Sequence, residues 1–435
     1  MSLISLAMIV KDEEAALAHC LKSVETLVDE IIIVDTGSRD KTVEIAQAFG
    51  ARIYHFKWCD DFAAARNESL KYCLSPWVLV LDADEAIDPL DYEKIRDACI
   101  HQTADVYELT IRNYMSSSLS TTHDIGAAPN KSAYSEGKEY PFYTDNPCMR
   151  LVRRFEGLSF SGKIHETIGK TVLSLGKSIG KLDAVIHHYG KADRDREENK
   201  AQYYFTLARR EAEKKPADVW NQFNLLQQAL CAEQWEAAVG AAQASMKLSA
   251  SVEPVVLYGA GIALQKMNRH EEAIDYFDLL LRQNPKHALG NLCKGTSYEA
   301  LGNMNAAREL MLKAMDLQPG YIPARVCLSE LELRLNNFEA ARKTALDAID
   351  VAPTEPALYD LLLKIELARN NRQQAAQDAL RGIQMCPNGG EGRWHRLVAV
   401  CLYQSGETAT AKSILELGIR TFPNDPDLRR LSGMI

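Results

Sequence analysis

Residues 77–88, "WVLVLDADEAID", run from an apolar segment directly into the acidic side chains Asp82, Asp84 and Glu85. The apolar segment has the length and composition of a buried β-strand. Three carboxylates clustered behind such a strand repel one another. The stretch therefore predicts either a solvated turn after a core strand or a site for a cation.

The composition is that of a folded protein with several domains. The chain has 435 residues, of which 46% are hydrophobic and 25% are charged, and its formal net charge is −9. This length favours about two to four domains, and the composition is not that of a disordered chain. An acidic balance disfavours duplex DNA or RNA, so we expect no nucleic-acid partner.

The cysteines and the first residues bear on the cellular compartment. The ten cysteines include no C-x-x-C pair, which favours reduced thiols over a disulfide framework or a zinc site. The apolar start of "MSLISLAMIVKDEE" is too short for a signal peptide. No apolar run reaches the ~18 residues of a spanning helix. We expect a cytoplasmic protein with no transmembrane segment.

Strand-like and helix-like segments alternate in the first part of the chain. Apolar runs at 3–10, 28–38, 51–56 and 77–85 are separated by segments with helical periodicity. Such alternation predicts parallel strands with crossover helices, whose ligands bind at the carboxyl ends of the strands. Acids follow three of these strands, which predicts a shared polar cleft lined by Asp12, Glu13, Asp35, Asp82 and Asp84.

The later part of this region is more polar. Residues 113–147 are rich in Ser, Gly, Pro and Tyr and predict a long functional loop. Two further strands are expected, one at 148–154 and one at 183–190, the second containing His187 and His188. The highly charged residues 191–216 then predict a connecting helix that ends at Pro216.

The C-terminal half has an internal period of 34 residues. Prolines, turn residues and small residues all keep this interval: Pro285, Pro319, Pro353 and Pro387; Asn268, Gly302, Asn336 and Asn370; Ala273, Ala307, Ala341 and Ala375. A 34-residue helix-turn-helix unit with this punctuation resembles the tetratricopeptide repeat. Residues 217–435 are expected to form about five such repeats, stacked into a solenoid with a concave groove.

Four stretches in the N-terminal part together resemble family 2 glycosyltransferases. They are "SLAMIVKDEE", "EIIIVDTGSRDKT", "WCDDFAAARNESL" and "LDADE", in this order. With the repeats, the whole chain resembles the bacterial subgroup that carries a C-terminal tetratricopeptide-repeat domain. The resemblance implies an α/β GT-A (Rossmann-like, mostly parallel sheet) domain at 1–190, the connecting helix at 191–216, and an all-α solenoid at 217–435.

The resemblance also implies an activity. The expected enzyme is a metal-dependent, inverting hexosyl- or N-acetylhexosaminyl-transferase that uses a nucleotide-sugar donor, expected to be a UDP-sugar. A divalent cation, Mn²⁺ or Mg²⁺, would stabilise the leaving diphosphate as a Lewis acid, and such hard cations prefer carboxylate oxygens. In the motif formed by Asp82, Ala83 and Asp84, the resemblance implies that Asp82 contacts the donor ribose and Asp84 the metal. Glu85 is either a third contact or solvated.

The nucleotide is expected to lie against three further motifs. Asp35 matches the aspartate that binds uracil in the family, the alternative being a cap for the helix that starts near Asp40. Gly37 and Ser38 form a tight turn with Thr36 that lets a nucleotide approach the backbone. The remaining donor-binding candidates are Lys11 and Glu13 in the first-strand motif, where the family more often has Asn than Asp12, and Arg66 and Asn67.

The segment around Arg66 also has structural alternatives. Asp60 or Asp61 is expected to cap the helix that carries Arg66. Arg66 is expected beside the diphosphate, where a guanidinium makes charge-assisted hydrogen bonds. An ion pair between Arg66 and Asp61 is the structural alternative.

Histidines late in the domain are candidates for the metal site. Strand alternation allows only one of His187 and His188 to face the cleft, and we choose His188 as a metal ligand beside Asp84. The pair His165 and Glu166 matches the subgroup's "HE" motif.

Glu166 is expected either to contact the acceptor or the sugar, or to act as the general base that removes the proton from the nucleophile as it attacks the anomeric carbon. Asp124 and Asp145 compete with it for this role. Arg150, Arg153 and Arg154 are candidates to approach the diphosphate, two of them being expected to pair with surface acids instead.

Two functions are open at this point. In the first, the chain is an enzyme whose repeats present a peptide, protein or glycan acceptor or form a homodimer. In the second, the repeats are a protein-interaction scaffold and the catalytic domain is degenerate. The presence of Asp35, Arg66, Asn67, Asp82 and Asp84 favours the enzyme. A nucleotidyltransferase would need a Gly-rich phosphate loop, which "MIVKDEE" does not offer.

Overall fold

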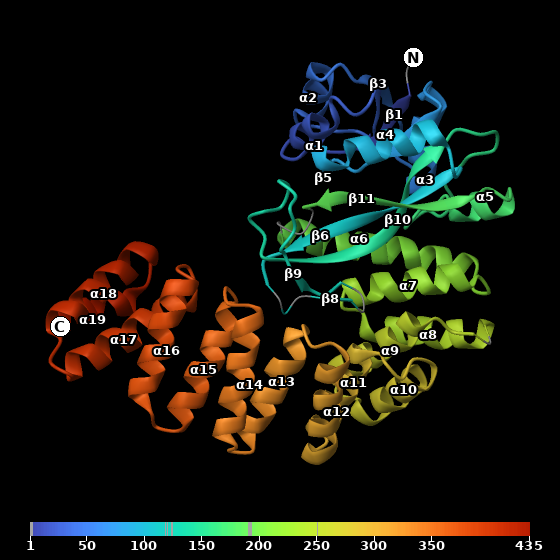
Figure 1. Ribbon diagram of the computed structural model, residues 1–435. Helices are drawn as coiled ribbons and strands as arrows, with labels where there is room; N and C mark the ends of the chain where they lie inside the picture. The colour runs from blue at the N-terminus through green and yellow to red at the C-terminus, as the bar shows by residue number, and fades with distance from the viewer. Residues whose placement is uncertain (1–2, 118, 120, 123–124, 190–193, 250) are drawn as a thin grey trace. The chain divides into compact units, whose positions relative to one another are not determined.

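The computed structural model describes residues 3–117, 119, 121–122, 125–189, 194–249 and 251–435. It divides into two compact units, one formed by Met1–Ser116 with Asn130–Gly259 and the other by Ser117–Pro129 with Ala260–Ile435. Figure 1 shows an α/β unit and a helical unit, and each is described by itself. The domain boundaries expected from the sequence, at residues 190 and 216, stay predictions; the first compact unit extends further, to Gly259.

The first unit is built on a sheet with the strand order β3-β2-β1-β4-β10-β6-β11-β5. Its first four strands run parallel to one another, and helices connect them as the alternating sequence pattern predicted. These elements are β1 (Ile4–Val10), α1 (Leu17–Val24), β2 (Glu30–Asp35), α2 (Thr42–Ala48), β3 (Arg52–His55), α3 (Phe62–Tyr72) and β4 (Trp77–Val80).

The parallel strands are continuous apolar runs because both faces of the sheet are covered. Leu6 and Met8 of β1 belong to one core cluster, whereas Ala7 of the same strand belongs to another. The same alternation divides Leu79 from Val78 in β4. A strand buried on both faces has no polar side, which explains its uninterrupted hydrophobicity.

The second half of the sheet is mixed. β10 is antiparallel to both β4 and β6, and β11 is parallel to β6 but antiparallel to β5. This half of the first unit contains β5 (Glu85–Ile87), η1 (Pro89–Asp91), α4 (Tyr92–His101), β6 (Val106–Met115), β10 (Phe142–Arg153), α5 (Gly169–Ser174) and β11 (Ile179–His188). The segment Ser117–Pro129 of the other unit carries β7 (Thr121–Thr122) and β8 (Ile125–Gly126), which pair with each other as a separate two-stranded sheet, and β9 (Ala128–Pro129).

The polar stretch expected to be one long loop is partly strand. β6 extends to Met115 and β10 begins at Phe142, so both ends of the 113–147 stretch belong to the sheet. Their pairing is regular, with Phe142 opposite Met115 and Thr144 opposite Asn113. Polar residues are compatible with a strand when the backbone groups find partners in the ladder, and this is why composition alone misplaced these ends.

The acidic stretch that follows β4 is a turn rather than an extended continuation of the strand. β4 ends at Val80, and the backbone N–H of Glu85 donates to the carbonyl oxygen of Asp82 at 3.1 Å. The Glu85 carboxylate accepts the backbone N–H of Asp82 at 2.8 Å, which closes the turn from the other side. β5 then starts at Glu85 and pairs with β11, placing Glu85 opposite His188.

The helical part confirms the repeat pattern. Helix starts at Pro254, Ala288, Ile322 and Pro356 are 34 residues apart. The helices are α6 (Arg194–Lys214), α7 (Val219–Cys231), α8 (Trp235–Leu248), α9 (Pro254–Lys266), α10 (His270–Gln283), α11 (Ala288–Ala300), α12 (Met304–Leu317), α13 (Ile322–Arg334), α14 (Phe338–Val351), α15 (Pro356–Ala368), α16 (Arg372–Met385), η2 (Gly390–Gly392), α17 (Arg393–Gln404), α18 (Thr408–Thr421) and α19 (Pro426–Met434).

The periodic residues have the structural roles that their types suggest. Asn268, Gly302, Asn336 and Asn370 all adopt positive φ between paired helices, the left-handed conformation that Gly and Asn tolerate best. The alanines at the same interval, such as Ala307 and Ala341, are fully buried where neighbouring helices meet. In the connecting region, α6 lies within the charged stretch that was expected to be helical.

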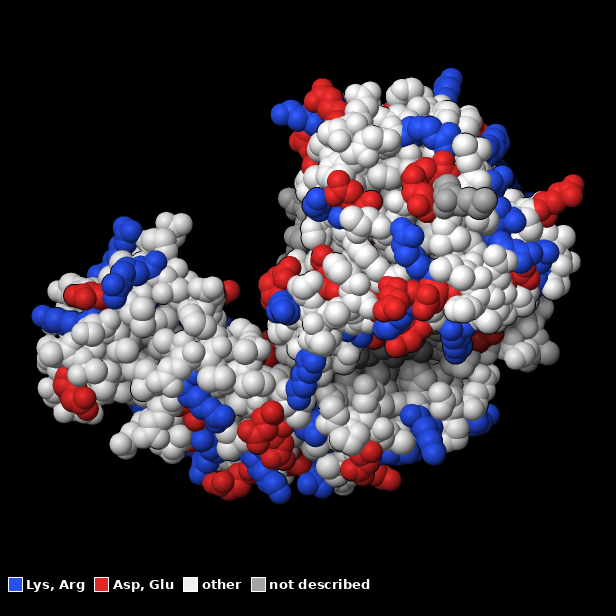
Figure 2. Space-filling model, turned by 45° about the horizontal axis from the view of Figure 1, so that its top comes forward, with Lys and Arg blue, Asp and Glu red and all other residues white. Residues whose placement is uncertain are grey.

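The surface is charged with both signs. On the face drawn in Figure 2, acidic and basic side chains are interspersed over both units. Among the described helices, none is both long enough and apolar enough to span a bilayer.

Candidate active site

A chain of alternating charges lies at the carboxyl end of β4. Arg66, on α3, donates from Nη2 to Asp82 Oδ1 at 2.6 Å and from Nε to Glu166 Oε1. Arg150, on β10, donates from Nη2 to Asp82 Oδ2 at 3.0 Å and to Glu85 Oε1 at 3.0 Å. Each carboxylate is therefore held by at least one guanidinium, and the mutual repulsion expected of the acids is offset by two arginines.

Burial sharpens the electrostatics of this chain. Arg66 is only 6% exposed and Glu85 only 2%. Burial tends to raise the pKa of Asp82, but the charges and hydrogen bonds of Arg66 and Arg150 outweigh it and hold that pKa well below its usual value. For Glu85 burial prevails over the Arg150 charge, and with the nearby Asp82 carboxylate it raises the pKa to about 7. Glu85 is therefore buried, not solvated, and its hydrogen bond from the Asp82 N–H holds the turn in place.

Asp84 points to the other side of the turn, where it meets His188. His188 Nε2 lies 3.5 Å from Asp84 Oδ2, and His188 Nδ1 lies 2.8 Å from Asn113 Oδ1. Burial opposes ionisation of both groups, but their interaction lowers the pKa of Asp84 and raises the pKa of His188. Asn113 therefore orients the imidazole toward the carboxylate.

The neighbouring His187 lies on the opposite face of β11. It is fully buried, and its Nδ1 is 2.6 Å from the hydroxyl oxygen of Tyr114. Burial lowers its pKa to about 4, so it is a neutral core residue. The two imidazoles thus face opposite sides of β11, as strand alternation predicts, and the role of His188 as a metal ligand stays a prediction.

The residues around Asp84 fit a divalent cation that keeps other ligands. In the part of the chain that the structure describes, no group of three or more His, Cys, Asp or Glu side chains is arranged to hold a metal. Asp84 and His188 form a pair whose oxygen and nitrogen donors suit Mn²⁺, and Asp84 alone suits Mg²⁺. A cation bound by so few protein ligands takes the rest from phosphate and water, as at nucleotide sites.

The loop after β2 is organised by Asp35. Its Oδ1 accepts the backbone N–H of Ser38 at 3.0 Å and its Oδ2 that of Gly37 at 3.2 Å, and His55 Nδ1 lies 3.3 Å from Oδ2. Gly37 has φ +110°, which only glycine adopts without strain. Asp35 is not a helix cap, because Asp40 instead accepts the backbone N–H of Thr42 at the start of α2.

Hydrogen bonds connect the motif after β1 to the loop that follows β2. Asp12 has φ +54°; its N–H donates to Ser38 Oγ at 3.0 Å, and its carboxylate accepts the N–H of Arg39 at 2.7 Å. The N–H of Glu13 donates to Thr42 Oγ1 at 2.7 Å. Lys11 is exposed. These bonds set the shape of the edge where the first two strands end.

Asn67 is occupied with the protein backbone. Its Nδ2 donates to the carbonyl of Phe160 at 3.0 Å, and its Oδ1 accepts the Phe160 N–H at 2.7 Å. Asp61 caps α3 by accepting the Ala64 N–H at 2.9 Å, as one of the two predicted caps. Arg66 is ion-paired with Asp82 and Glu166, and Asp61, the structural alternative, is not its partner.

The other predicted bases and arginines are dispersed. Asp145 lies on β10, where it pairs with Arg112 through two hydrogen bonds of 2.9 and 2.8 Å, and Asp124 lies outside the described residues. Among the three arginines, only Arg150 reaches the acid cluster. Arg153 pairs with Asp105 at 3.4 Å, whereas Arg154 donates to backbone carbonyls rather than to an acid.

A cavity of about 230 Å³ opens beside this cluster. Arg66, Arg150, Glu166 and Phe160 line it. Arg66 Nη1 is buried and has no hydrogen-bond partner among the residues that the structure describes. A buried guanidinium nitrogen without an acceptor is unusual, and it offers a hydrogen bond to an anionic group next to Glu166.

The sequence reading missed one residue of this site. Asn113, which orients His188, was hidden in the polar stretch interpreted as a loop. The parallel pairing of β11 with β6 places His188 opposite Asn113. Recognising that β6 extends through residue 113 would have revealed it.

Comparison with known proteins agrees with this architecture. Residues 5–156 match the family model for glycosyl transferase family 2, and residues 258–322 match a tetratricopeptide-repeat model. The chain is 29% identical over 210 residues to an uncharacterized glycosyltransferase of Rickettsia typhi, an alignment that covers 47% of this chain and 66% of that protein.

Further relatives match shorter parts of the chain. The SPbeta prophage-derived glycosyltransferase SunS of Bacillus subtilis is 30% identical over 165 residues, which is 38% of this chain and 34% of SunS. A TPR repeat-containing protein of Synechococcus elongatus is 52% identical over 87 residues, 20% of this chain and 22% of that protein.

Solved structures that resemble the chain include tetratricopeptide-repeat proteins. The C-terminal part of a TPR repeat-containing protein from Cytophaga hutchinsonii matches with a TM-score of 0.44 and 12% identity, covering 54% of this chain and 98% of that chain. The chain spans about two thirds or less of the curated relatives it matches. The N-terminal region is thus similar to family 2 glycosyl transferases, and the helical region is similar to tetratricopeptide-repeat proteins.

Proposed function

We propose, from the family 2 glycosyltransferase domain of this chain, that it transfers a sugar from a nucleotide-sugar donor to an acceptor with inversion at the anomeric carbon. The proposed donor is a UDP-sugar, with a hexose or an N-acetylhexosamine as the sugar. The proposed acceptor is a peptide or protein. The observation that carries the proposal is the Asp84 and His188 pair beside the arginine-held carboxylates Asp82 and Glu166.

The donor would lie along the edge where the first strands end. The loop from Asp35 to Ser38 would face the base, and Asp82 the ribose. Asp84, with His188 when the ion is Mn²⁺, would hold a cation that stabilises the leaving diphosphate as a Lewis acid. Arg66 Nη1, which has no hydrogen-bond partner among the described residues, would donate a hydrogen bond to a diphosphate oxygen.

The acceptor nucleophile would attack from the side of Glu166. A bond forms between the acceptor atom and the anomeric carbon, and the bond from that carbon to the diphosphate oxygen breaks with its electron pair going to the diphosphate. Glu166 takes the proton of the nucleophile as general base. Arg66, which donates to Glu166, orients this carboxylate.

The cellular setting is also part of the proposal. All ten cysteines are free thiols, as is usual in a reducing compartment, which supports a cytoplasmic location. The tetratricopeptide repeats bury their faces on one another and would present the acceptor protein or join two copies of the chain.

Donor hydrolysis tests the proposal without knowledge of the acceptor. UDP- and GDP-sugars are screened with Mn²⁺ or Mg²⁺ for thermal stabilisation of the protein, since a ligand of the native state raises the melting temperature. Hydrolysis of the best donor is then measured for the wild type, for Asp84→Ala and for Asp183→Ala. Asp183 is a matched control because its side chain is 97% exposed and lies outside the site.

The expected result is hydrolysis that requires the cation and collapses in Asp84→Ala only. Full turnover of Asp84→Ala in EDTA would refute the metal-dependent mechanism. No binding and no hydrolysis of any donor by the wild type would favour the alternative, a repeat-based interaction scaffold with a degenerate domain.

A further inference from the structure

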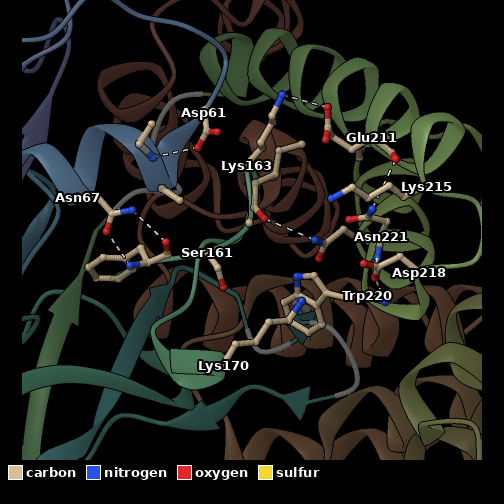
Figure 3. Close-up of a pocket in the computed structure, with 17 residues that line it drawn as sticks. Asp61, Asn67, Ser161, Lys163, Lys170, Glu211, Lys215, Asp218, Trp220 and Asn221 are labelled. Atoms are coloured by element: carbon tan, nitrogen blue, oxygen red, sulfur yellow. Dashed lines mark hydrogen bonds and ion pairs between the residues drawn. The ribbon is translucent and has the colours of Figure 1, made fainter. Parts of the chain in front are cut away.

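A second and larger cavity lies within the first unit. Its volume is about 420 Å³, and its walls come from the start of α3, from residues 160–164, from α5 and from helices α6 and α7 (Figure 3). Neither the donor-binding candidates on the first two strands nor the Asp84 and His188 pair lines it. Asn67, another donor-binding candidate, does line it, but both of its amide atoms are bonded to the Phe160 backbone. The polar groups that this cavity offers to a ligand therefore differ from those proposed to bind the donor.

Two polar atoms in the wall of this cavity are buried without a partner. Asn224 is 6% exposed; its Nδ2 donates to the carbonyl of Ile164 at 3.4 Å, but its Oδ1 accepts no hydrogen bond from any described residue. In the same described ranges, the indole Nε1–H of Trp220, one turn earlier on α7, has no acceptor. One donor and one acceptor left unsatisfied in the same cavity wall cost free energy. A ligand that supplies the complementary pair recovers it.

The charged side chains that line the cavity differ in whether they have an ion-pair or hydrogen-bond partner. Lys163 pairs with Glu211 at 3.1 Å, and the Asp218 carboxylate caps α7 by accepting the N–H groups of Trp220 and Asn221. By contrast, Lys170 and Lys215 make no ion pair with any described residue. Asp61, the third carboxylate of the lining, caps α3, so the three carboxylates equal the three lysines in number but are all engaged by backbone N–H groups or by Lys163. Lys170 and Lys215 are therefore the charged groups of the lining that are left to pair with acidic groups of a ligand.

The surroundings of Trp220 discriminate between a peptide and a sugar. Its ring is stacked with Phe223 at 5.4 Å between centroids. Lys170, which Figure 3 shows beside Trp220, places Nζ 5.8 Å from the ring centroid. The indole faces are therefore engaged, and the ring offers its N–H edge instead of a stacking platform for a sugar. A peptide unit carries one carbonyl acceptor and one N–H donor, which match Trp220 Nε1 and Asn224 Oδ1.

We propose that this cavity docks an extended acidic segment of the peptide acceptor. The main chain of the segment would bond to Trp220 and Asn224, and its Asp or Glu side chains would pair with Lys170 and Lys215. The proposal rests on the proposed function for the role of the bound segment as acceptor.

The cavity is connected to the reaction site through the segment that carries Glu166. Phe160 lines both cavities. Asn224 holds the carbonyl of Ile164, and Gln228 Nε2 lies 2.5 Å from His165 Nε2. Helix α7 thus grips the two residues that precede Glu166, and a segment bound on α7 lies beside the expected base.

The test is peptide binding to the full chain without donor. The probe is a fluorescein-labelled octapeptide in which glycine alternates with aspartate and glutamate, and its control peptide carries asparagine and glutamine instead. Fluorescence anisotropy is measured for the wild type, Trp220→Phe, Lys215→Ala and Lys214→Ala. Lys214 is the matched control because it pairs with Glu211 and does not line the cavity.

The acidic peptide is expected to bind, and the amide control to bind at least tenfold more weakly. Loss of the Trp220 hydrogen bond is expected to weaken binding about three- to tenfold. Loss of the Lys215 charge is expected to weaken it about two- to fivefold, with Lys214→Ala unchanged. Lys215 is exposed, so its variant keeps the test valid even if Trp220→Phe does not fold.

Three results would overturn the proposal: equal binding of the acidic and amide peptides, binding unaffected by both cavity variants, or displacement of the peptide by maltohexaose, which would indicate a glycan site. Donor hydrolysis in the same preparations separates the two proposals. Hydrolysis without peptide binding overturns the docking site alone, whereas peptide binding without hydrolysis of any donor overturns the proposed enzyme.

Discussion

Replacing Arg150 by methionine should destabilise the first unit much more than the same change at Arg153. Both residues lie on β10, but the Arg150 side chain is 12% exposed and pairs with Asp82 and Glu85, whereas Arg153 is 39% exposed and pairs with Asp105 alone. Removing one partner of a buried ion pair costs about 3–5 kcal/mol. An exposed pair contributes about 0–1 kcal/mol.

The difference should depend on pH because Glu85 titrates near neutrality. Its pKa is raised to about 7 by burial in spite of the Arg150 charge. A raised carboxyl pKa means that folding favours the protonated form, so stability falls as pH rises from the unfolded pKa to the folded one. At about pH 5.5 Glu85 is mostly protonated, so the positive charge of Arg150 stabilises it little. Above about pH 8 it is ionised in the wild type, and the variant loses the compensating cation.

Hydrogen exchange measured by mass spectrometry gives the local free energies. Protection factors, corrected for the intrinsic exchange rate at each pH, are compared for peptides from β4 and β10 in EDTA. A loss of 3–5 kcal/mol corresponds to a decrease of about two to three and a half orders of magnitude if exchange follows opening of the unit. Peptides from α11–α16, in the second unit, serve as an internal control.

Two outcomes would refute this reasoning. Equal effects of Arg150→Met and Arg153→Met would mean that the acid cluster does not depend on its buried cation. A smaller effect of Arg150→Met at about pH 8 than at about pH 5.5 would mean that Glu85 is not the group that Arg150 compensates.

Three further predictions concern other parts of the chain. Burial opposes ionisation of Glu30, but its hydrogen bonds and the Arg52 charge lower its pKa. The stability that ionised Glu30 contributes is therefore lost as pH falls through the folded pKa. In Glu30→Gln, the urea concentration at the midpoint of unfolding should therefore change less with pH in the acidic range. Gly37→Ala should destabilise by about 1–2 kcal/mol because φ is +110° there, whereas Gly240→Ala, in a helix with open space around it, should stabilise by about 0.5–1 kcal/mol in the same urea titration. Arg342→Met should destabilise the repeats by about 3–5 kcal/mol, measured by exchange in α15 and α16, because it removes the ion-pair partner of the buried Asp378 and leaves the buried Glu366 with Arg369 alone.

The regular elements were predictable because their signals are local. The parallel strands are apolar throughout, since the sheet is covered on both faces. The repeats are visible because each 34-residue unit makes the same contacts with its neighbour, so the same residue types recur at Asn336 and Asn370. The ends of β6 and β10 escaped prediction because their polar side chains carry no periodic signal, and only pairing of the two strands defines them.

The candidate site was predictable in part. Residue types and strand parity pointed to Asp84 and His188, which the structure brings to 3.5 Å. The partners of Arg66 were not predictable, because Glu166 lies 100 residues away along the chain. The different partners of the two aspartates in the acidic turn were not predictable either: Asp82 pairs with two arginines, whereas Asp84 lies beside a histidine.

The amino-acid sequence by itself determined the order of most strands and helices, the repeat period and the candidate residues for a cation and a nucleotide, because periodicity and motif chemistry are properties of neighbouring residues. The tertiary structure decided which charges compensate one another. The short strand β5 pairs with β11 and sets Glu85 opposite His188, and α3 carries Arg66 between two carboxylates from distant segments. Such contacts follow from sheet register and helix packing, which arise only when the whole domain buries its core.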